Sequence, residues 1–225
     1  MRRAGQRGAP PLNCGVMRQT KSEWFRNTTW DAYISQAFED KLRRARHKEQ
    51  YLRIQACTLA DSHPHVALEL LERYFELPNK FDHAQAHVDR ARAQLVLNRV
   101  DDAIQSYEAA LARETEFPNL KTQAYIDLPF LIATRRIASL YERAVRLLDA
   151  NQDRLTFPVD RFQWHAAYCF VAADSGALAA AKAHATRALE LTTVKDSGFR
   201  YHPTIGLVTD GYDRVMQALR ACLAA

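Results

Sequence analysis

The sequence has no glycine through most of its length. Of its seven glycines, none lies between Gly15 and Gly176. Loops that cradle phosphate groups, and the fingerprint that binds dinucleotides, need backbone conformations that glycine alone adopts readily. The glycine-free stretch therefore excludes both kinds of site from most of the chain. The alternation of apolar and polar residues that is typical of strands is equally scarce.

The four cysteines are too dispersed for a cysteine-based metal site. Cys14, Cys57, Cys169 and Cys222 form no CxxC pair, although such pairs are typical of zinc ribbons and redox motifs. Reduced thiols are therefore expected rather than a disulfide framework. The chain also lacks a nucleophile elbow and an HExxH motif. We accordingly expect a protein that is not an enzyme and that carries no cofactor.

No apolar run approaches the roughly 20 residues that a membrane-crossing helix needs. The N-terminus is basic but lacks the apolar middle of a secretory signal, so we expect a cytoplasmic protein with no membrane partner. The net charge of +5 resides in residues 1–26, which we expect to be a disordered basic tail. The remainder carries equal numbers of acids and bases, and nucleic acid is therefore not an expected partner of the folded part.

Helical periodicity is what the sequence has in abundance. Within residues 97–114, Ala103, Tyr107 and Ala110 are spaced by three or four residues and lie on one apolar stripe. A second stripe lies just upstream, and Asn98 falls in the short turn between the two, where a left-handed backbone is often required. Two helices joined by so short a turn pack antiparallel.

This pair of helices recurs along the chain. Corresponding positions in the second helices are Ala67, Ala103, Ile137 and Ala181, which are separated by 36, 34 and 44 residues. Such a period is typical of stacked helix pairs, because each pair can bury its apolar face only against its neighbours. The pairs are expected at about 47–77, 82–115, 119–150 and 161–192, with end helices at 28–47 and 209–223.

The pattern resembles the tetratricopeptide repeat (TPR). The match is best in residues 84–115, where Ala91, Asn98, Ala103 and Tyr107 occupy the small and aromatic positions of that family. The resemblance implies an all-α fold, a right-handed α-α superhelix (a TPR-like solenoid) of about four degenerate helix pairs with end helices. It would form a single domain over residues 27–225, with a C-terminal loop and capping helix at 193–225.

The resemblance also implies a binding surface. In TPR-like proteins the first helices of successive pairs line a concave groove that binds peptides or protein domains. Carried over residue by residue, the groove positions are Gln85, Arg92, Ile126, Phe130, Gln163 and Phe170. The apolar members of this set could equally be core residues. Asp127 lies one place past this register, and it would reach the groove only if Pro129 twists its helix.

The expected function is therefore non-catalytic binding of a protein or peptide partner in the groove. Two other functions remain open at this point. The chain could neutralise a toxin or effector, as an immunity-type partner does, or it could be a nucleic-acid-associated regulator that uses its basic N-terminal arm. Neither the partner nor the oligomeric state follows from the sequence.

Two local features need separate treatment. His83 and His87 lie one helical turn apart, which is a metal-ligand spacing, but no third ligand accompanies them and we expect no metal. An enzyme on this scaffold would combine them with an acid such as Asp127. Residues 156–162 and 197–210 are expected to be loops, the second either a recognition loop or a lid that buries its apolar residues over the last helix pair.

Overall fold

The computed structural model describes residues 23–78 and 82–224, and these residues contain no strand. The all-helical class expected from the sequence is therefore confirmed for this part of the chain. The helices are α1 (Ala32–Arg44), α2 (Lys48–Leu59), α3 (Pro64–Phe75), α4 (His83–Val96), α5 (Val100–Glu116), α6 (Ala124–Thr134), α7 (Tyr141–Ala150), α8 (Pro158–Asp174), α9 (Leu178–Leu191) and α10 (Asp213–Ala224), with short 3-10 helices η1 (Ala138–Leu140), η2 (Gln152–Arg154) and η3 (Asp210–Tyr212).

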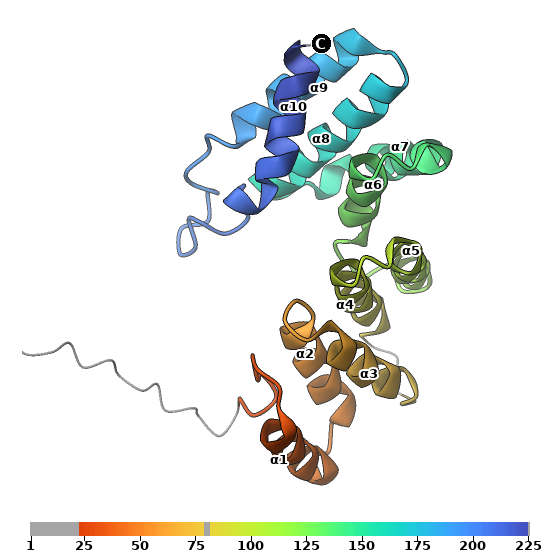
Figure 1. Cartoon of the computed structure of the whole chain (residues 1–225), viewed down its shortest axis with the longest axis vertical. Coiled ribbons are helices and arrows are strands. Elements are labelled where there is room, and N and C mark those ends of the chain that lie inside the picture. Colours follow the sequence, from red (N-terminus) through yellow and green to blue (C-terminus); the bar gives the residue numbers. More distant parts are fainter. Residues whose placement is uncertain (1–22, 79–81, 225) are drawn as a thin grey trace, which may run out of the picture.

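The helices follow one another along the long axis of the molecule (Figure 1). Helices α2, α4 and α6 lie on one side of the ribbon, and α3, α5 and α7 lie on the other. Every extensive helix–helix contact joins neighbours or next neighbours along the chain, such as α4 with α5 and α6 with α8. Helix α10 packs on α8 and α9, and so covers the C-terminal end of the array.

Three of the turns within helix pairs share one backbone conformation. Asn98, Arg136 and Gly176 have positive φ angles of 56°, 55° and 77°. In each case the N–H of the following residue donates to the carbonyl five residues earlier, at 2.9, 3.0 and 2.8 Å. This arrangement is a common way to end a helix, because it satisfies carbonyls that have no partner inside the helix. The left-handed backbone expected at Asn98 is confirmed.

The turns also correct one step of the repeat alignment. Ala103 and Ala181 each lie five residues after the positive-φ residue of their turn. In the third unit the residue five places after Arg136 is Tyr141, so Tyr141 and not Ile137 is the equivalent position. Ile137 instead precedes η1, which leads directly into α7. The spacing of the pairs is therefore more even than the sequence pattern indicated.

The folded part begins before residue 27. The ring centroids of Trp24 and Phe25 lie 4.8 and 4.7 Å from that of Tyr51 in α2. Asn27 exchanges hydrogen bonds with Gln55, whose side chain is fully buried: the Asn27 backbone N–H donates to Gln55 Oε1 at 3.0 Å, and Gln55 Nε2 donates to the Asn27 carbonyl at 2.8 Å. The rest of the expected tail, residues 1–22, lies outside the described residues.

Helix α8 begins at Pro158, inside the segment that the sequence pattern placed in a loop. Asp160 Oδ2 accepts hydrogen bonds from the backbone N–H groups of Thr156 (3.1 Å) and Phe157 (3.0 Å), which fixes the start of the helix. The sequence interpretation took Pro158 as a separator. Proline is in fact favoured at the first helical position, where its missing N–H costs nothing.

Residues 197–210 fold back over the start of α8. The Val159 N–H donates to the Gly206 carbonyl at 2.8 Å. Gly206 has a φ of 66°, and a Cβ atom there would lie 2.4 Å from the Phe157 ring, so glycine is required at this contact. The segment thus covers the helix start, as a lid would. Ile205, however, remains 47% exposed, and its expected burial is wrong.

Candidate binding groove

A hollow of about 440 Å³ opens at the N-terminal ends of the first helices α4, α6 and α8. Gln85 lines it from α4, Tyr125 from α6 and Asp160 from α8. Gln123, just before α6, and the two cationic residues Lys121 and Arg154 also line it. One helical turn after Gln123, Asp127 lies on the same face of α6. We call the hollow, together with this face of α6, the groove.

Asp127 lacks a compensating cation. Its carboxylate accepts a hydrogen bond from Gln163, and in the described part of the chain no lysine or arginine forms an ion pair with it. Burial, with a smaller contribution from the charge of Asp160, raises the pKa of Asp127 to about 7. The hydrogen bond from Gln163 and the positive charge of Arg92 act in the opposite direction. The Asp127 charge is therefore poorly stabilised near neutral pH.

The other carboxylates of the groove are already neutralised from within the chain. Asp89 is 4% exposed, and it accepts hydrogen bonds from Arg53 Nη1 at 3.1 Å and from Gln85 Nε2 at 3.2 Å. Asp82 precedes α4 but makes no side-chain capping bond to it, and it accepts a hydrogen bond from Arg53 Nε at 3.3 Å. The carboxylate of Asp160 already accepts hydrogen bonds from two backbone N–H groups at the start of α8. Asp127 thus differs from its neighbours in having no cationic or capping partner.

Two aromatic residues, Phe130 and Tyr212, pack together beside Gln163. Tyr212, from η3, lies with its ring centroid 5.9 Å from that of Phe130, and its hydroxyl accepts a hydrogen bond from Gln163 Nε2 at 3.1 Å. Burial and the charge of Asp127 raise the pKa of both Tyr107 and Tyr212. A carboxylate beside aromatic rings is a combination that holds ammonium and guanidinium groups well.

The structure divides the six residues predicted for the groove. Ile126 and Phe170 are 1% and 2% exposed, and their side chains belong to the core instead of lining the groove. Arg92 is exposed, but its guanidinium is engaged: Nε donates to Asp61 Oδ1 at 2.8 Å, and Nη2 donates to the other carboxylate oxygen. A partner that used Arg92 would first have to displace Asp61.

Of the remaining three predicted residues, only Gln85 lines the hollow. Gln163 is 8% exposed and donates to Tyr212, and Phe130 is partly buried beside the same tyrosine. The groove face of α6 is rotated by one residue from the expected register, so that Asp127 is brought in and Ile126 is turned to the core. Tyr212 was not among the residues predicted for the groove. No local pattern links it to Gln163, which lies 49 residues earlier.

His83 and His87 are packing residues in this fold. Their ring centroids lie 6.4 Å apart with the planes at 89°, and the Phe75 ring stacks on His87 with a centroid distance of 4.6 Å. Burial lowers the pKa of His87 to about 4, so this imidazole is neutral at pH 7. Across residues 23–78 and 82–224, no group of three or more histidine, cysteine, aspartate or glutamate side chains is placed to hold a metal ion.

Comparison of the chain with family models, with curated proteins and with solved structures found no match. None of the helices formed by the described residues is long and apolar enough to cross a membrane. The function is therefore inferred from the geometry of the groove.

Proposed function

We propose that this chain is a non-catalytic, TPR-like right-handed solenoid that binds an extended segment of a partner protein along the groove, and that Asp127 receives a lysine or arginine side chain of that segment. The observation that carries the proposal is the buried carboxylate of Asp127, which has no cation of its own. A ligand cation would stabilise the charged form and offset the cost of burying it.

The surroundings of Asp127 suit such a ligand. The rings of Phe130 and Tyr212 offer apolar area and π faces to the methylene stem and the charged head of a basic side chain. The hollow presents the side-chain amides of Gln85 and Gln123, which can receive other residues of the same segment. A few such anchors usually supply most of the binding free energy of an interface.

The test uses short peptides selected from a display library for binding to the full-length chain. Each peptide is synthesised with lysine and with norleucine at its basic position, and the affinities are measured by fluorescence anisotropy. The lysine form should bind more tightly. Asp127→Asn should reduce this preference by about tenfold or more, because the ligand cation then has no buried counter-charge.

The matched control is Asp153→Asn, which makes the same chemical change at an exposed position outside the groove. It should leave the lysine preference intact. Phe130→Ala should weaken the binding of both peptide forms, because it removes apolar contact area. Equal affinity of the two forms for the unmodified chain, or a lysine preference that survives Asp127→Asn, would contradict the proposal.

A further inference from the structure

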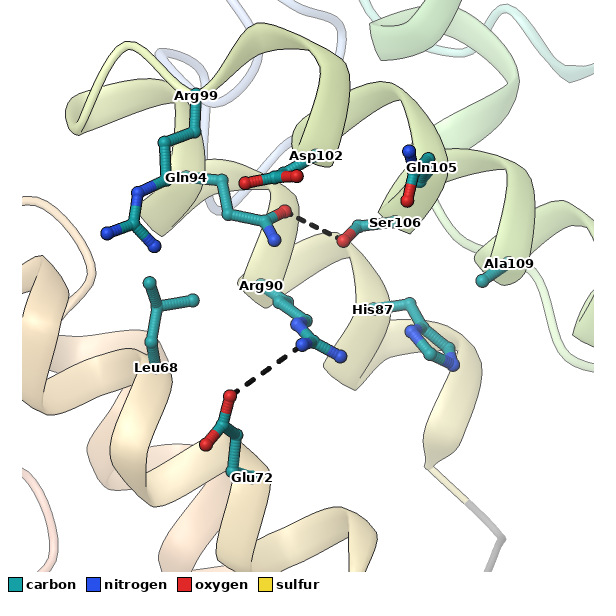
Figure 2. Close-up of a pocket in the computed structure, with 10 residues that line it drawn as sticks. All are labelled: Leu68, Glu72, His87, Arg90, Gln94, Arg99, Asp102, Gln105, Ser106 and Ala109. Carbon is teal, nitrogen blue, oxygen red and sulfur yellow. Dashed lines mark hydrogen bonds and ion pairs between the residues drawn. The ribbon is translucent and has the colours of Figure 1, made fainter.

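A second cavity, of about 270 Å³, opens between α3 and α5, with α4 as its floor (Figure 2). Different faces of helix α4 contribute residues to the groove and to this cavity. Gln85 and Asp89 lie along the groove, whereas Arg90 and Gln94 line this cavity. The cavity is therefore separate from the groove, and binding in it does not depend on Asp127.

Gln94 is a largely buried residue at the floor of the cavity, and its amide nitrogen is open to the cavity. Its side chain is 6% exposed, and its Oε1 atom accepts a hydrogen bond from Ser106 Oγ at 2.7 Å. Because this bond fixes the amide plane, the Nε2 group faces the space between the helices, as Figure 2 shows. Nε2 donates to no partner in the described part of the chain. The Nε2 group is not among the buried polar atoms that lack a partner, so its hydrogens are open to the cavity and available to a ligand that enters it.

Two guanidinium groups extend toward the same space (Figure 2). Arg90 lies over the ring of Phe75, 5.6 Å from its centroid, and its Nη2 atom lies 3.8 Å from Glu72 Oε1, which is beyond hydrogen-bond distance. Arg99 makes no side-chain hydrogen bond or ion pair within residues 23–78 and 82–224. The donors of both side chains are thus largely unused.

We propose that this cavity binds the carboxylate of a glutamate or aspartate side chain on a partner protein, with Arg90, Arg99 and Gln94 as its hydrogen-bond donors. Guanidinium groups match the planar carboxylate and form charge-assisted hydrogen bonds with it. The oxygens of such a ligand would accept hydrogen bonds from donors that have no acceptor within the described part of the chain.

The charge of the cavity favours a carboxylate over a phosphate. Glu72 and Asp102 line the same cavity, and their negative charges would repel a dianion more strongly than a single carboxylate. His87 adds no positive charge at pH 7, because burial lowers its pKa to about 4. Asp102 and Gln105 can also accept hydrogen bonds from the backbone N–H groups that flank an acidic side chain of a peptide.

The test is an NMR titration of the full-length chain with two short, end-capped peptides that carry no other charged group and differ only in a central glutamate or glutamine. The glutamate peptide should produce saturable shifts of the Gln94 side-chain NH₂ signals and of the Arg90 and Arg99 Nε–H signals. Arg99→Gln should weaken its binding by about tenfold. Glu72→Gln should strengthen binding by a factor of about two to five, because it releases Arg90 from a competing carboxylate.

Two variants serve as controls of matched charge. Asp101→Asn removes an acid from the same turn of α5 but outside the cavity, and Arg161→Gln removes an exposed arginine of α8. Both should leave the affinity for the glutamate peptide nearly unchanged. The proposal is overturned if the glutamine peptide binds equally well, if inorganic phosphate displaces the glutamate peptide at a lower concentration than acetate does, or if Arg99→Gln has no greater effect than Arg161→Gln.

Discussion

Replacing Asp127 by asparagine should stabilise the free protein, and the gain should be larger at pH 8 than at pH 5. Burial and the nearby charge of Asp160 raise the pKa of Asp127 to about 7. A carboxyl group whose pKa is raised by folding contributes its stability in the protonated form, and this contribution is lost as the pH rises through about 7. Asparagine has a similar shape and stays neutral, so the variant avoids the loss.

The size of the effect follows from the pKa difference. A rise from the ordinary 3.8 to about 7 corresponds to about 4 kcal/mol in the free energy of unfolding at high pH, of which about 2.5 kcal/mol develops between pH 5 and pH 8. This value is a ceiling, because the Asp127 side chain keeps some contact with solvent. We expect about 1–2 kcal/mol over this range, or about 3–6 °C in the thermal midpoint of a chain of this size.

Thermal unfolding followed by circular dichroism at pH 5, 6, 7 and 8 measures the effect directly. The difference between the midpoints of Asp127→Asn and the unmodified chain should grow with pH, whereas Asp153→Asn should show no such trend. A difference that is the same at pH 5 and pH 8 would refute the reasoning. A stabilising substitution that also weakens peptide binding is the behaviour expected at a functional site.

Two further substitutions test the packing around the groove. Arg53→Ala leaves the buried carboxylate of Asp89 without its cation and should cost about 3–5 kcal/mol of unfolding free energy in urea titrations at pH 7. Arg43→Ala, which breaks an exposed ion pair, should cost less than about 1 kcal/mol. Similar losses in the two variants would show that burial is not decisive. Gly206→Ala should lower the thermal midpoint more than Gly198→Ala does. Both glycines have positive φ, but only a Cβ atom at position 206 would lie against an aromatic ring. Equal losses in the two variants would contradict the steric explanation.

The helix pairs could be predicted because their signal is local. The stripe of Ala103, Tyr107 and Ala110 recurs wherever a second helix packs on a first, and all three residues are buried. The conformation of Asn98 was likewise predictable, because asparagine tolerates positive φ. Arg136 occupies the equivalent place in the next pair. Its residue type gives no such signal, and this explains why the alignment of that unit was displaced.

The groove was only partly predictable because a first helix is packed on several sides. Helix α6 contacts α5, α7 and α8, so apolar residues occur around most of its circumference. A pattern of apolar spacing therefore cannot separate the fully buried Ile126 from Phe130, which is only partly buried. The environments of Asp127 and Tyr212 depend on which distant segments meet, and spacing within one helix carries no information about that.

The contacts between successive helices have a consequence for how the chain unfolds. Because each helix is stabilised mainly by those next to it in the sequence, the stability of the array is close to a sum of successive interfaces. Opening of α1–α3 does not require separation of α8, α9 and α10. The two ends of the molecule can therefore lose and regain structure separately, and the amide protons of one end can exchange with solvent while those of the other stay protected.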